Sequence, residues 1–314
     1  MLHERILKLH NALLECGLSC ETRVPLSRYT TFRIGGDAAL AAFPRTEEEA
    51  LLVLRYAKEL DVPLFVIGGG SNLLCPDAGY NGAVLFTKRI NEISFRDAED
   101  GSVFVTAGAG VTLSALSKAL LEKGLTGAEF LYGIPGTVGG AVVMNAGAYG
   151  GEIAQILSSS RYVNRNFPDA SDTRDLAAHR YGYRTSVYLT APEELVLSAT
   201  FLLKKGNAVE IENEMRRLLS QRKEKQPLEY PSAGSFFKRP IGTFAGKLIE
   251  DSGLKGTRIG GAEISPKHAG FIVNRGGATE SDVRRLAALV RETVLRETGR
   301  LLESEVRTMG GEPI

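Results

Sequence analysis

The feature that most constrains this chain is the stretch GIPGTVGGAVVMNAGAYGG at residues 133–151. It holds seven glycines and no charged residue in nineteen positions. Glycine and proline weaken a helix, so we expect neither a membrane span nor a good helix here. Glycine also lets the main chain adopt positive φ and come close to a ligand. We therefore expect a ligand-facing loop, with tight turns and close strand packing as the alternative.

A second glycine-rich loop, GGGSNLL, occupies residues 68–74. Successive main-chain N–H groups in such loops form concave nests that suit phosphate oxygens, and the hydroxyls of Ser71 and Thr137 add donors. For GGG by itself, a tight turn is the favoured interpretation. Neither glycine stretch contains the P-loop pattern or the GxGxxG pattern of dinucleotide folds.

Helix-like and strand-like segments alternate along the chain, which is typical of α/β structure. The segment 46–60 begins with Thr46 and Glu49 in capping-box spacing and leads into the apolar run 62–70. Residues 226–240 are interpreted as an irregular loop. Further helices are expected at 2–16, 112–123, 208–225, 245–253 and 281–299, and further strands at 83–87, 92–97, 103–110, 158–166, 194–205 and within 261–274.

Composition limits the class of protein. A chain of 314 residues is expected to form two or three domains. Its formal net charge of +1 gives no electrostatic reason to expect nucleic acid or a membrane surface as partner. The cysteines Cys16, Cys20 and Cys75 are sparse, and no signal-peptide pattern opens the chain, so we expect a cytoplasmic protein. Two thiols alone make a poor metal site, and no metal is expected.

Eight ordered blocks resemble the family of UDP-N-acetylenolpyruvoylglucosamine reductases. The resemblance covers about residues 20–310, and its spacing is similar to the shorter bacterial form. The blocks are TTFRIGG (30–36), GGGSNLL (68–74), GIPGTVGGAVVMNAGAYGGE (133–152), YGYRTS (181–186), PSAGSFFKRP (231–240), AGKLIEDSGLKG (245–256), KHAGFIVN (267–274) and LESEV (302–306).

The resemblance implies an α+β fold of the vanillyl-alcohol-oxidase type, with two α/β subdomains that bind FAD and a third α/β domain that binds substrate. It places the first FAD-binding subdomain at residues 1–80, with residues 301–314 returning to it or near it. The second subdomain is expected at 81–205 and the substrate-binding domain at 206–300. The family holds FAD without a covalent bond, so a dissociable flavin is expected.

The implied reaction belongs to peptidoglycan precursor synthesis. NADPH reduces the flavin, and the reduced flavin reduces the enolpyruvyl ether of UDP-N-acetylglucosamine-enolpyruvate to give UDP-N-acetylmuramate. No side chain donates hydride, so the reaction needs a redox cofactor. Hydride arriving at the methylene carbon leaves charge that spreads into the carboxylate. The protein must stabilise this enolate and protonate the neighbouring carbon. A monomer is expected.

Three residues are expected to carry the chemistry through the resemblance. Arg184 suits the carboxylate, because guanidinium is always charged and binds carboxylates in a two-pronged manner. Ser235 is the expected proton donor, and Glu305 is expected to assist the enolate. From the sequence alone, the alternatives are a solvated arginine, a turn serine or helix cap, and an exposed strand glutamate. Glu303 would face the same side of a strand as Glu305, and only the family pattern selects Glu305.

Binding residues are also implied by block position. The expected flavin contacts are Gly68, Gly69, Gly70, Ser71, Asn72, Gly136, Thr137, Gly139, Asn145 and Ala146. The expected contacts to the UDP-sugar are Tyr149, Arg222, Lys238, Lys255 and Asn274.

Three other functions remain as alternatives. An oxidase of the same fold, acting on a small alcohol or sugar, would use O2 and would give Ser235, Arg184 and Glu305 no shared purpose. A non-catalytic nucleotide-binding protein would be expected to have lost one of these three residues, and all are present. An enzyme unrelated to flavin would be colourless.

Overall fold

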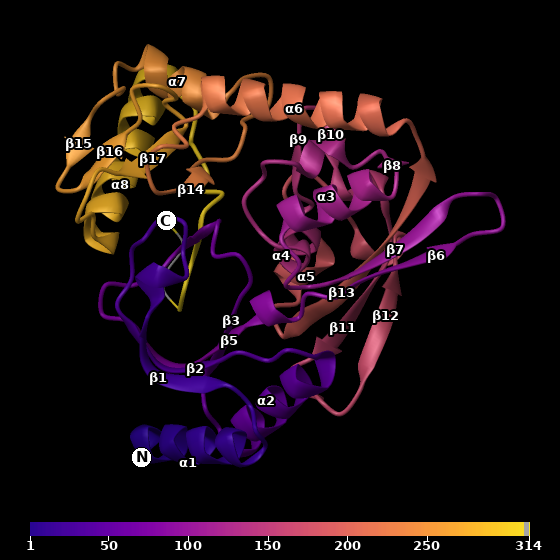
Figure 1. Ribbon diagram of the computed structural model, residues 1–314. Helices are drawn as coiled ribbons and strands as arrows, with labels where there is room; N and C mark the ends of the chain where they lie inside the picture. Colours follow the sequence, from indigo (N-terminus) through magenta and orange to yellow (C-terminus); the bar gives the residue numbers. More distant parts are fainter. Residues whose placement is uncertain (311–313) are drawn as a thin grey trace. The chain divides into compact units, whose positions relative to one another are not determined.

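The computed structural model describes residues 1–310 and 314 (Figure 1). The chain divides into two compact units, which are described separately. Unit 1 comprises Met1–Thr22, Leu40–Gly69 and Gly82–Arg222, and unit 2 comprises Arg23–Ala39, Gly70–Asn81 and Lys223–Ile314.

Four strands form the first sheet, in the order β1 (Cys20–Pro25), β2 (Asp37–Ala42), β5 (Tyr80–Phe86) and β3 (Leu64–Ile67). Strands β3 and β5 are parallel, with Leu64 opposite Ala83. The helix α2 (Glu47–Glu59) connects β2 to β3, as the sequence predicts for a helix that leads into a buried strand. Helix α1 (Leu2–Glu15) packs on α2.

The predicted capping box at the start of α2 forms only in part. The Thr46 hydroxyl accepts a hydrogen bond from the Glu49 main-chain N–H at 3.1 Å. The Glu49 carboxylate accepts from the main-chain N–H of Arg45 at 2.7 Å and does not return to Thr46. Because Arg45 also places its guanidinium on Glu49 at 2.9 Å, the carboxylate is drawn one residue further out.

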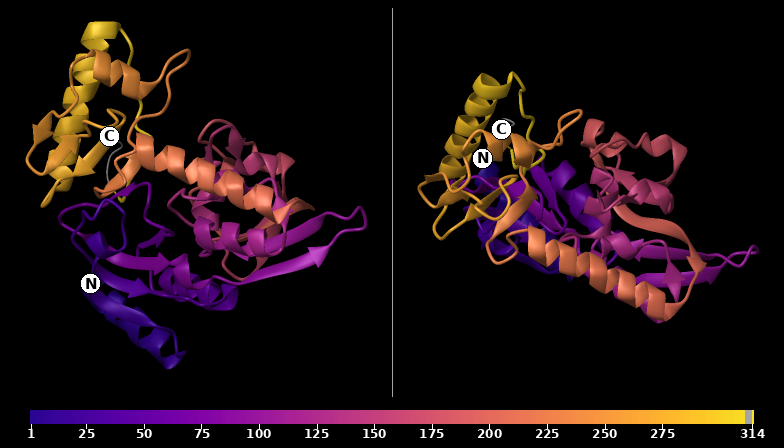
Figure 2. Two further views of the ribbon diagram at one scale, coloured as in Figure 1. Left: turned by 45° about the horizontal axis from the view of Figure 1, so that its top comes forward. Right: turned by 90° about the horizontal axis from the view of Figure 1, so that it is seen from above.

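The second sheet belongs to unit 1 and is antiparallel throughout. Its order is β12 (Ser171–Asp175), β11 (Leu157–Asn164), β13 (Glu194–Lys205), β7 (Val103–Gly108) and β6 (Ile93–Asp97), and β8 (Leu125–Thr126) also pairs with β13. The β6–β7 hairpin projects outward in the views of Figures 1 and 2. Helices α3 (Leu113–Glu122), α4 (Val138–Met144) and α6 (Ala208–Lys225) contribute to the core of this unit.

Helix α4 contradicts the expectation that residues 133–151 hold no good helix. Seven residues of that stretch are helical, and Val138, Ala141 and Val142 are buried. The helix packs on β13 and β7, and tertiary packing of an apolar face outweighs the weak helix propensity of glycine. Asn145 ends the helix in the left-handed conformation, at φ +44°.

Unit 2 contains a four-stranded antiparallel sheet in the order β14 (Ser232–Ser235), β17 (Phe271–Asn274), β16 (Ala262–Ile264) and β15 (Arg258–Ile259). Helices α7 (Ala245–Asp251) and α8 (Glu280–Thr298) pack against each other, and α8 also packs on β15 and β16. Strands β4 (Leu73–Leu74) and β18 (Arg307–Thr308) pair in parallel. The core includes Ile249, Ile272, Val283, Leu286 and Val290.

Strand β14 corrects the interpretation of residues 226–240 as an irregular loop. Ser232 lies opposite Val273 and Ser235 lies opposite Phe271, with an irregularity between the two pairs. The sequence SAGS has no β-branched or aromatic residue, so nothing in its local pattern indicates a strand. Its pairing partner β17 supplies the apolar residues.

The other predicted helices and strands are confirmed within a few residues. Among residues 1–310 and 314, no helix is both long enough and apolar enough to cross a membrane. The remaining short elements are η1 (Leu26–Arg28), η2 (Thr87–Arg89), η3 (Glu129–Leu131), β9 (Gly147–Ala148), β10 (Gly151–Glu152), η4 (Ile153–Gln155), η5 (Ala177–His179) and α5 (Val187–Thr190).

Candidate active site

The two glycine loops meet inside unit 1. A Cβ atom added at Gly69 would lie 2.7 Å from the Cα of Gly136, and one added at Gly68 would lie 2.6 Å from the hydroxyl oxygen of Thr137. Real Cβ atoms do not approach other atoms so closely. The glycines are therefore required for the main chains of 68–69 and 136–137 to lie against each other.

Thr137 carries a polar atom with no protein partner. Its hydroxyl oxygen is buried and makes no hydrogen bond within the described residues, although Thr137 stands at the N-cap of α4. A buried hydroxyl without a partner is costly, and a group that binds to it is one explanation for it. A glycine cradle with a spare hydroxyl fits a phosphate-containing cofactor such as FAD.

Other main-chain donors of the glycine stretch are already used by the protein. Gly139 donates to the carbonyl of Ala109 at 2.9 Å, and Ala146 donates to that of Ala141 at 2.9 Å. Asn145 donates to Val142 at 3.4 Å. The N–H groups of these three residues are thus satisfied within the protein, so any contact that they make to the flavin would use their other atoms.

Arg184 lies at a tight turn beside the end of α4. Its guanidinium donates to the carbonyl oxygens of Asn145 at 3.3 Å and Gly147 at 2.7 Å. Arg184 itself has φ +53°, the left-handed region that non-glycine residues seldom adopt. The side chain is half-buried, so it is not the fully solvated arginine that the sequence alone favours.

Ser235 and Glu305 belong to neighbouring segments of unit 2. Ser235 is exposed at the end of β14. The next residue, Phe236, accepts a hydrogen bond from the main-chain N–H of Glu305 at 2.9 Å, and Phe237 forms an antiparallel bridge with Ser304. The structure therefore brings the segments of these two predicted catalytic residues together. Arg184, the third predicted catalytic residue, belongs to unit 1.

Glu305 and Glu303 have different surroundings in the structure, which the sequence spacing does not indicate. Glu303 is exposed and forms an ion pair with Lys238 at 3.2 Å. Glu305 is half-buried, and its carbonyl accepts a hydrogen bond from the Asn72 side-chain amide at 3.1 Å. Asn72 belongs to the GGGSNLL loop, so one predicted flavin contact holds the backbone of one predicted catalytic residue.

The Gly70 end of that loop packs within unit 2. Gly70 has φ +62°, and a Cβ atom added there would lie 2.1 Å from the carbonyl oxygen of Tyr29. Thr31 donates its main-chain N–H to the Gly70 carbonyl at 3.0 Å. Ser71, the next residue in the sequence, is half-buried. Gly70 is thus needed for a tight main-chain approach.

The three predicted substrate contacts in unit 2 all have partners in the protein, and that of Lys238 is Glu303. The Asn274 amide donates to the carbonyl of Phe32 at 3.1 Å and accepts from the N–H groups of Gly276 and Ala278. Lys255 forms an ion pair with Glu250 at 2.6 Å and keeps about a third of its side chain exposed. These contacts show that Asn274 shapes its loop, whereas Lys255 is held by a carboxylate.

Arg222 and Tyr149 are the predicted substrate contacts of unit 1. Arg222 is only 8% exposed, and its Nε atom has no hydrogen-bond partner within the described residues. Burial lowers the pKa of its guanidinium, and the nearby Tyr149 opposes that effect. Tyr149 is exposed and has φ +54°. A buried cation with an unused donor is suited to an anionic group.

Sequence reasoning missed the residues that hold the Arg184 turn. The Ser186 hydroxyl donates to the carbonyl of Val143 at 2.6 Å, and the Asn145 amide donates to that of Gly182 at 3.1 Å. The sequence indicates Asn145 only as a flavin contact. The serine of YGYRTS was a signal, because serine next to a turn commonly bonds to the main chain.

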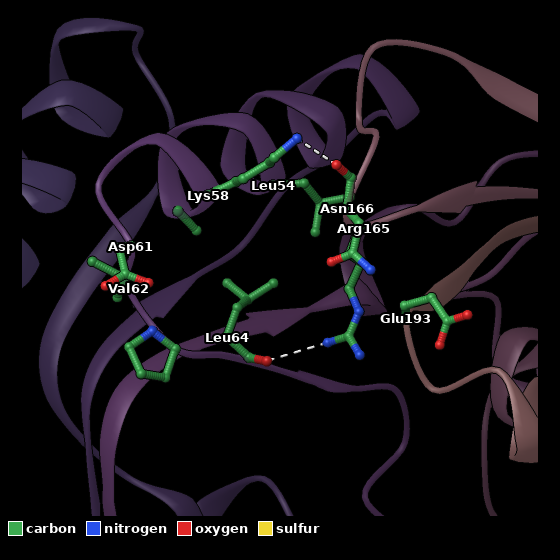
Figure 3. A pocket seen from close by; sticks show the side chains of 10 residues that line it. Leu54, Lys58, Asp61, Val62, Leu64, Arg165, Asn166 and Glu193 are labelled. Atoms are coloured by element: carbon green, nitrogen blue, oxygen red, sulfur yellow. Dashed lines mark hydrogen bonds between the residues drawn. The ribbon is translucent and has the colours of Figure 1, made fainter.

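A pocket of about 290 Å³ lies in another part of unit 1 (Figure 3). It contains none of the predicted site residues, and its walls include Lys58, Arg165 and Glu193. Lys58 donates to the carbonyl of Asn166, and Arg165 donates to that of Leu64 (Figure 3). These cations hold the two walls together, and the pocket shows no glycine cradle.

Comparison with known proteins agrees with this geometry. Residues 38–166 match the family described as FAD binding domain, and residues 226–309 match UDP-N-acetylenolpyruvoylglucosamine reductase, C-terminal domain. The fold and the glycine cradle therefore define an FAD-binding oxidoreductase with a separate C-terminal domain.

The relatives show which family of oxidoreductases this is. The chain is 44% identical over 286 residues to the UDP-N-acetylenolpyruvoylglucosamine reductase of Clostridium perfringens, which covers 91% of each chain. It is 46% identical to the UDP-N-acetylenolpyruvoylglucosamine reductase of Lachnoclostridium phytofermentans, again over 91% of each chain. The crystal structure of the Thermus caldophilus enzyme matches with a TM-score of 0.76 at 34% identity, covering 93% of this chain and 99% of that chain.

The chain belongs to the UDP-N-acetylenolpyruvoylglucosamine reductase family. It is an enzyme, and FAD is its cofactor. The α+β fold of the vanillyl-alcohol-oxidase type, with an FAD-binding region followed by a further domain, is confirmed.

Proposed function

We propose that this enzyme reduces UDP-N-acetylglucosamine-enolpyruvate to UDP-N-acetylmuramate, with NADPH as the reductant, as a cytoplasmic step of peptidoglycan precursor synthesis. The observation that carries the proposal is the similarity along nearly the full length, at 44% identity over 91% of the chain and of its relative. The presence of Arg184, Ser235 and Glu305 in their family blocks supports it.

Bound FAD supplies the hydride that no side chain can donate. The residues proposed to hold it are Gly68, Gly69, Gly70, Ser71, Asn72, Gly136, Thr137, Gly139, Asn145 and Ala146. Asn145 would contribute its main chain, because its side-chain amide is bonded to Gly182 and Ala154. The unpartnered Thr137 hydroxyl and the close approach of Gly69 to Gly136 support this assignment. No covalent tether is proposed: Cys75, the thiol next to this loop, is fully buried, and burial raises its pKa to about 12.

Arg184 binds the carboxylate of the enolpyruvyl group and stabilises the enolate as charge builds up there. Two of its donors are fixed on neutral carbonyl oxygens, which orient the guanidinium without cancelling its charge. A positive charge that is already oriented costs little reorganisation when the substrate changes. The planar guanidinium matches a carboxylate in two-pronged fashion.

Ser235 gives the proton to the carbon next to the carboxylate, and Glu305 assists the enolate as a hydrogen-bonding carboxyl group. Ser235 is exposed, so its hydroxyl can reach a bound substrate. The strand pairing of β14 and the bond from Glu305 N–H to Phe236 O fix the main chain of both residues. General acid catalysis needs this fixed geometry, because a serine hydroxyl is a weak acid.

The UDP-sugar is bound by Tyr149, Arg222, Lys238, Lys255 and Asn274. The buried Arg222 with its unused Nε donor supports a role with the diphosphate. Residues 1–80 are proposed as the first FAD-binding subdomain, with 301–314 returning to it or near it. Residues 81–205 are proposed as the second subdomain and 206–300 as the substrate-binding domain. The protein acts as a monomer and without a metal.

The direct test is an absorption spectrum of the purified protein under anaerobic conditions, with additions in sequence. A bound flavin spectrum is expected, which NADPH bleaches and which UDP-N-acetylglucosamine-enolpyruvate then restores. A colourless protein that takes up no FAD would refute the flavin assignment. A flavin that is restored only by O2 would favour an oxidase.

A further inference from the structure

Asn145, which ends helix α4, is completely buried. Its exposed fraction is 0%, and its side-chain amide joins two separate segments. The Nδ2 atom donates to the carbonyl of Gly182 at 3.1 Å, and the Oδ1 atom accepts from the N–H of Ala154 at 3.0 Å. The amide therefore connects the end of α4 to the turn that carries Arg184.

The Arg184 turn is a two-residue hairpin closed by Gly182 and Thr185. These residues exchange two main-chain hydrogen bonds of 3.2 Å each, with Tyr183 and Arg184 at the tip. Asn145 contacts this hairpin twice. Its side chain binds the Gly182 carbonyl at the base, and its own carbonyl accepts from the Arg184 guanidinium at 3.3 Å.

Helix capping alone does not account for the amide of Asn145. Asparagine tolerates the left-handed conformation that ends α4, at φ +44°. Glycine would serve that conformation at least as well, so the amide has a separate task. Its bond to Gly182 fixes the base of the hairpin relative to the end of α4. The carbonyls of Asn145 and Gly147 at that end hold the guanidinium. Its bond to Ala154 holds the segment that follows.

We propose that Asn145 is a positioning residue for Arg184, which fixes where the guanidinium meets the carboxylate of the substrate. The inference rests on the proposed role of Arg184. Without the amide, the hairpin can move relative to the carbonyls of Asn145 and Gly147. A displacement of about 1 Å at a positioning group can slow a reaction by about 10²-fold.

The test compares Asn145→Gly with Arg184→Ala and with the double variant. Glycine keeps the backbone conformation of residue 145 and removes only the amide. Glycine keeps the main chain through which Asn145 is proposed to contact FAD, so the flavin should stay bound, and its reduction by NADPH gives a reference rate for each variant. Reoxidation by the enolpyruvyl sugar should slow by about 10²-fold. A matched control, Asn207→Gly, removes an amide that caps α6 by accepting from Val209 N–H at 2.9 Å, and it should leave both rates unchanged.

The double variant shows whether Asn145 acts through Arg184. In the Arg184→Ala background, Asn145→Gly should slow reoxidation by no further factor, because the group it positions is gone. Hydrogen exchange of the main chain at residues 181–186 should also become faster in Asn145→Gly, and this readout does not depend on activity.

Each contrary result has a distinct meaning. Unchanged reoxidation in Asn145→Gly, or effects that multiply fully in the double variant, would overturn the inference. Loss of FAD in Asn145→Gly while Arg184→Ala retains it would also overturn it, because the side-chain amide of Asn145 would then serve the cofactor directly. If Arg184→Ala itself leaves reoxidation unchanged, the proposed role of Arg184 fails instead.

Discussion

Gly139 donates its main-chain N–H to the carbonyl oxygen of Ala109 at 2.9 Å, and a Cβ atom added at Gly139 would lie 2.9 Å from the Cβ of Ala109. This contact sets how closely α4 lies against the segment that follows β7. The neighbouring Gly140 is exposed, and a Cβ atom there would come no nearer than 3.9 Å to another residue. Close packing thus requires glycine at position 139 but not at position 140.

The pair gives a matched test of the glycine stretch. Gly139→Ala should lower the free energy of unfolding by about 1–3 kcal/mol, because the extra methyl group overpacks the contact with Ala109. Gly140→Ala should raise it by up to about 1 kcal/mol, because alanine favours the helix. Denaturant unfolding and the ratio of flavin to protein absorbance measure both variants. Equal effects would contradict the packing described for α4.

Glu305 and Glu303 provide a second matched pair. Glu305→Gln should slow reoxidation of the flavin by the enolpyruvyl sugar by about 10²-fold, as loss of one stabilising group commonly does. Glu303→Gln should stay near the wild-type rate, because Glu303 is exposed and its ion pair with Lys238 contributes little. Single-turnover kinetics distinguish them. The assignment is wrong if Glu303→Gln is the slower enzyme.

Arg174 and Glu194 form a deeply buried ion pair. Each side chain is 11% exposed, and the guanidinium donates to both carboxylate oxygens, at 2.7 and 2.9 Å. Arg174→Leu should cost about 3–5 kcal/mol of unfolding free energy, because it leaves a buried carboxylate without its partner.

The control for this prediction is Arg217→Leu. Arg217 pairs with Glu214, and their side chains are 55% and 41% exposed. Its removal should cost less than about 1 kcal/mol in the same denaturant titration. A loss for Arg174→Leu no larger than that of the control would show that burial does not decide the strength of the pair.

A buried histidine predicts a pH dependence of stability. His179 is fully buried, and its Nε2 atom lies 2.8 Å from the Ser160 hydroxyl. Burial lowers the pKa of His179 from its ordinary value of 6.5. Below that value the unfolded chain takes up a proton and the folded protein does not, so stability falls as the pH drops through this window. Each unit of lowering corresponds to about 1.4 kcal/mol.

His179→Gln should weaken this dependence. The free energy of unfolding, measured between about pH 7 and pH 5, should fall less in the variant than in the wild type. His268 remains in both proteins, and burial lowers its pKa too, so part of the dependence will persist. An identical slope in the two proteins would contradict the proposed cost of protonating His179.

The sequence predicts those elements in which apolar residues recur at a regular helical or strand spacing. Helices α6 and α8 show apolar faces, and their bounds agree with the structure within a few residues. It does not predict α4 or β14, because their own residues indicate neither state. In these elements the stability comes from partners elsewhere in the chain, namely β13 for α4 and β17 for β14.

The candidate site divides in the same way. The resemblance selects Arg184, Ser235 and Glu305 from short motifs. It cannot show that Asn145 bonds to Gly182, because these residues are 37 positions apart and no local pattern links them. Nor could spacing choose between Glu303 and Glu305. The family pattern selects Glu305, and the structure adds that Glu303 is exposed and paired with Lys238, whereas Glu305 is half-buried.

The most direct measurement is the rate of each half-reaction in Ser235→Ala, with Ser232→Ala on the same strand as control. NADPH should bleach the flavin of Ser235→Ala at the wild-type rate. The enolpyruvyl sugar should restore it about 10²–10⁴-fold more slowly, as expected for loss of a general acid. Ser232→Ala should stay near the wild type in both steps, because Ser232 keeps its main-chain hydrogen bond to Thr31 and its hydroxyl only accepts a long hydrogen bond of 3.4 Å from Gly234 N–H. If Ser235→Ala is reoxidised at the wild-type rate, Ser235 is not the proton donor.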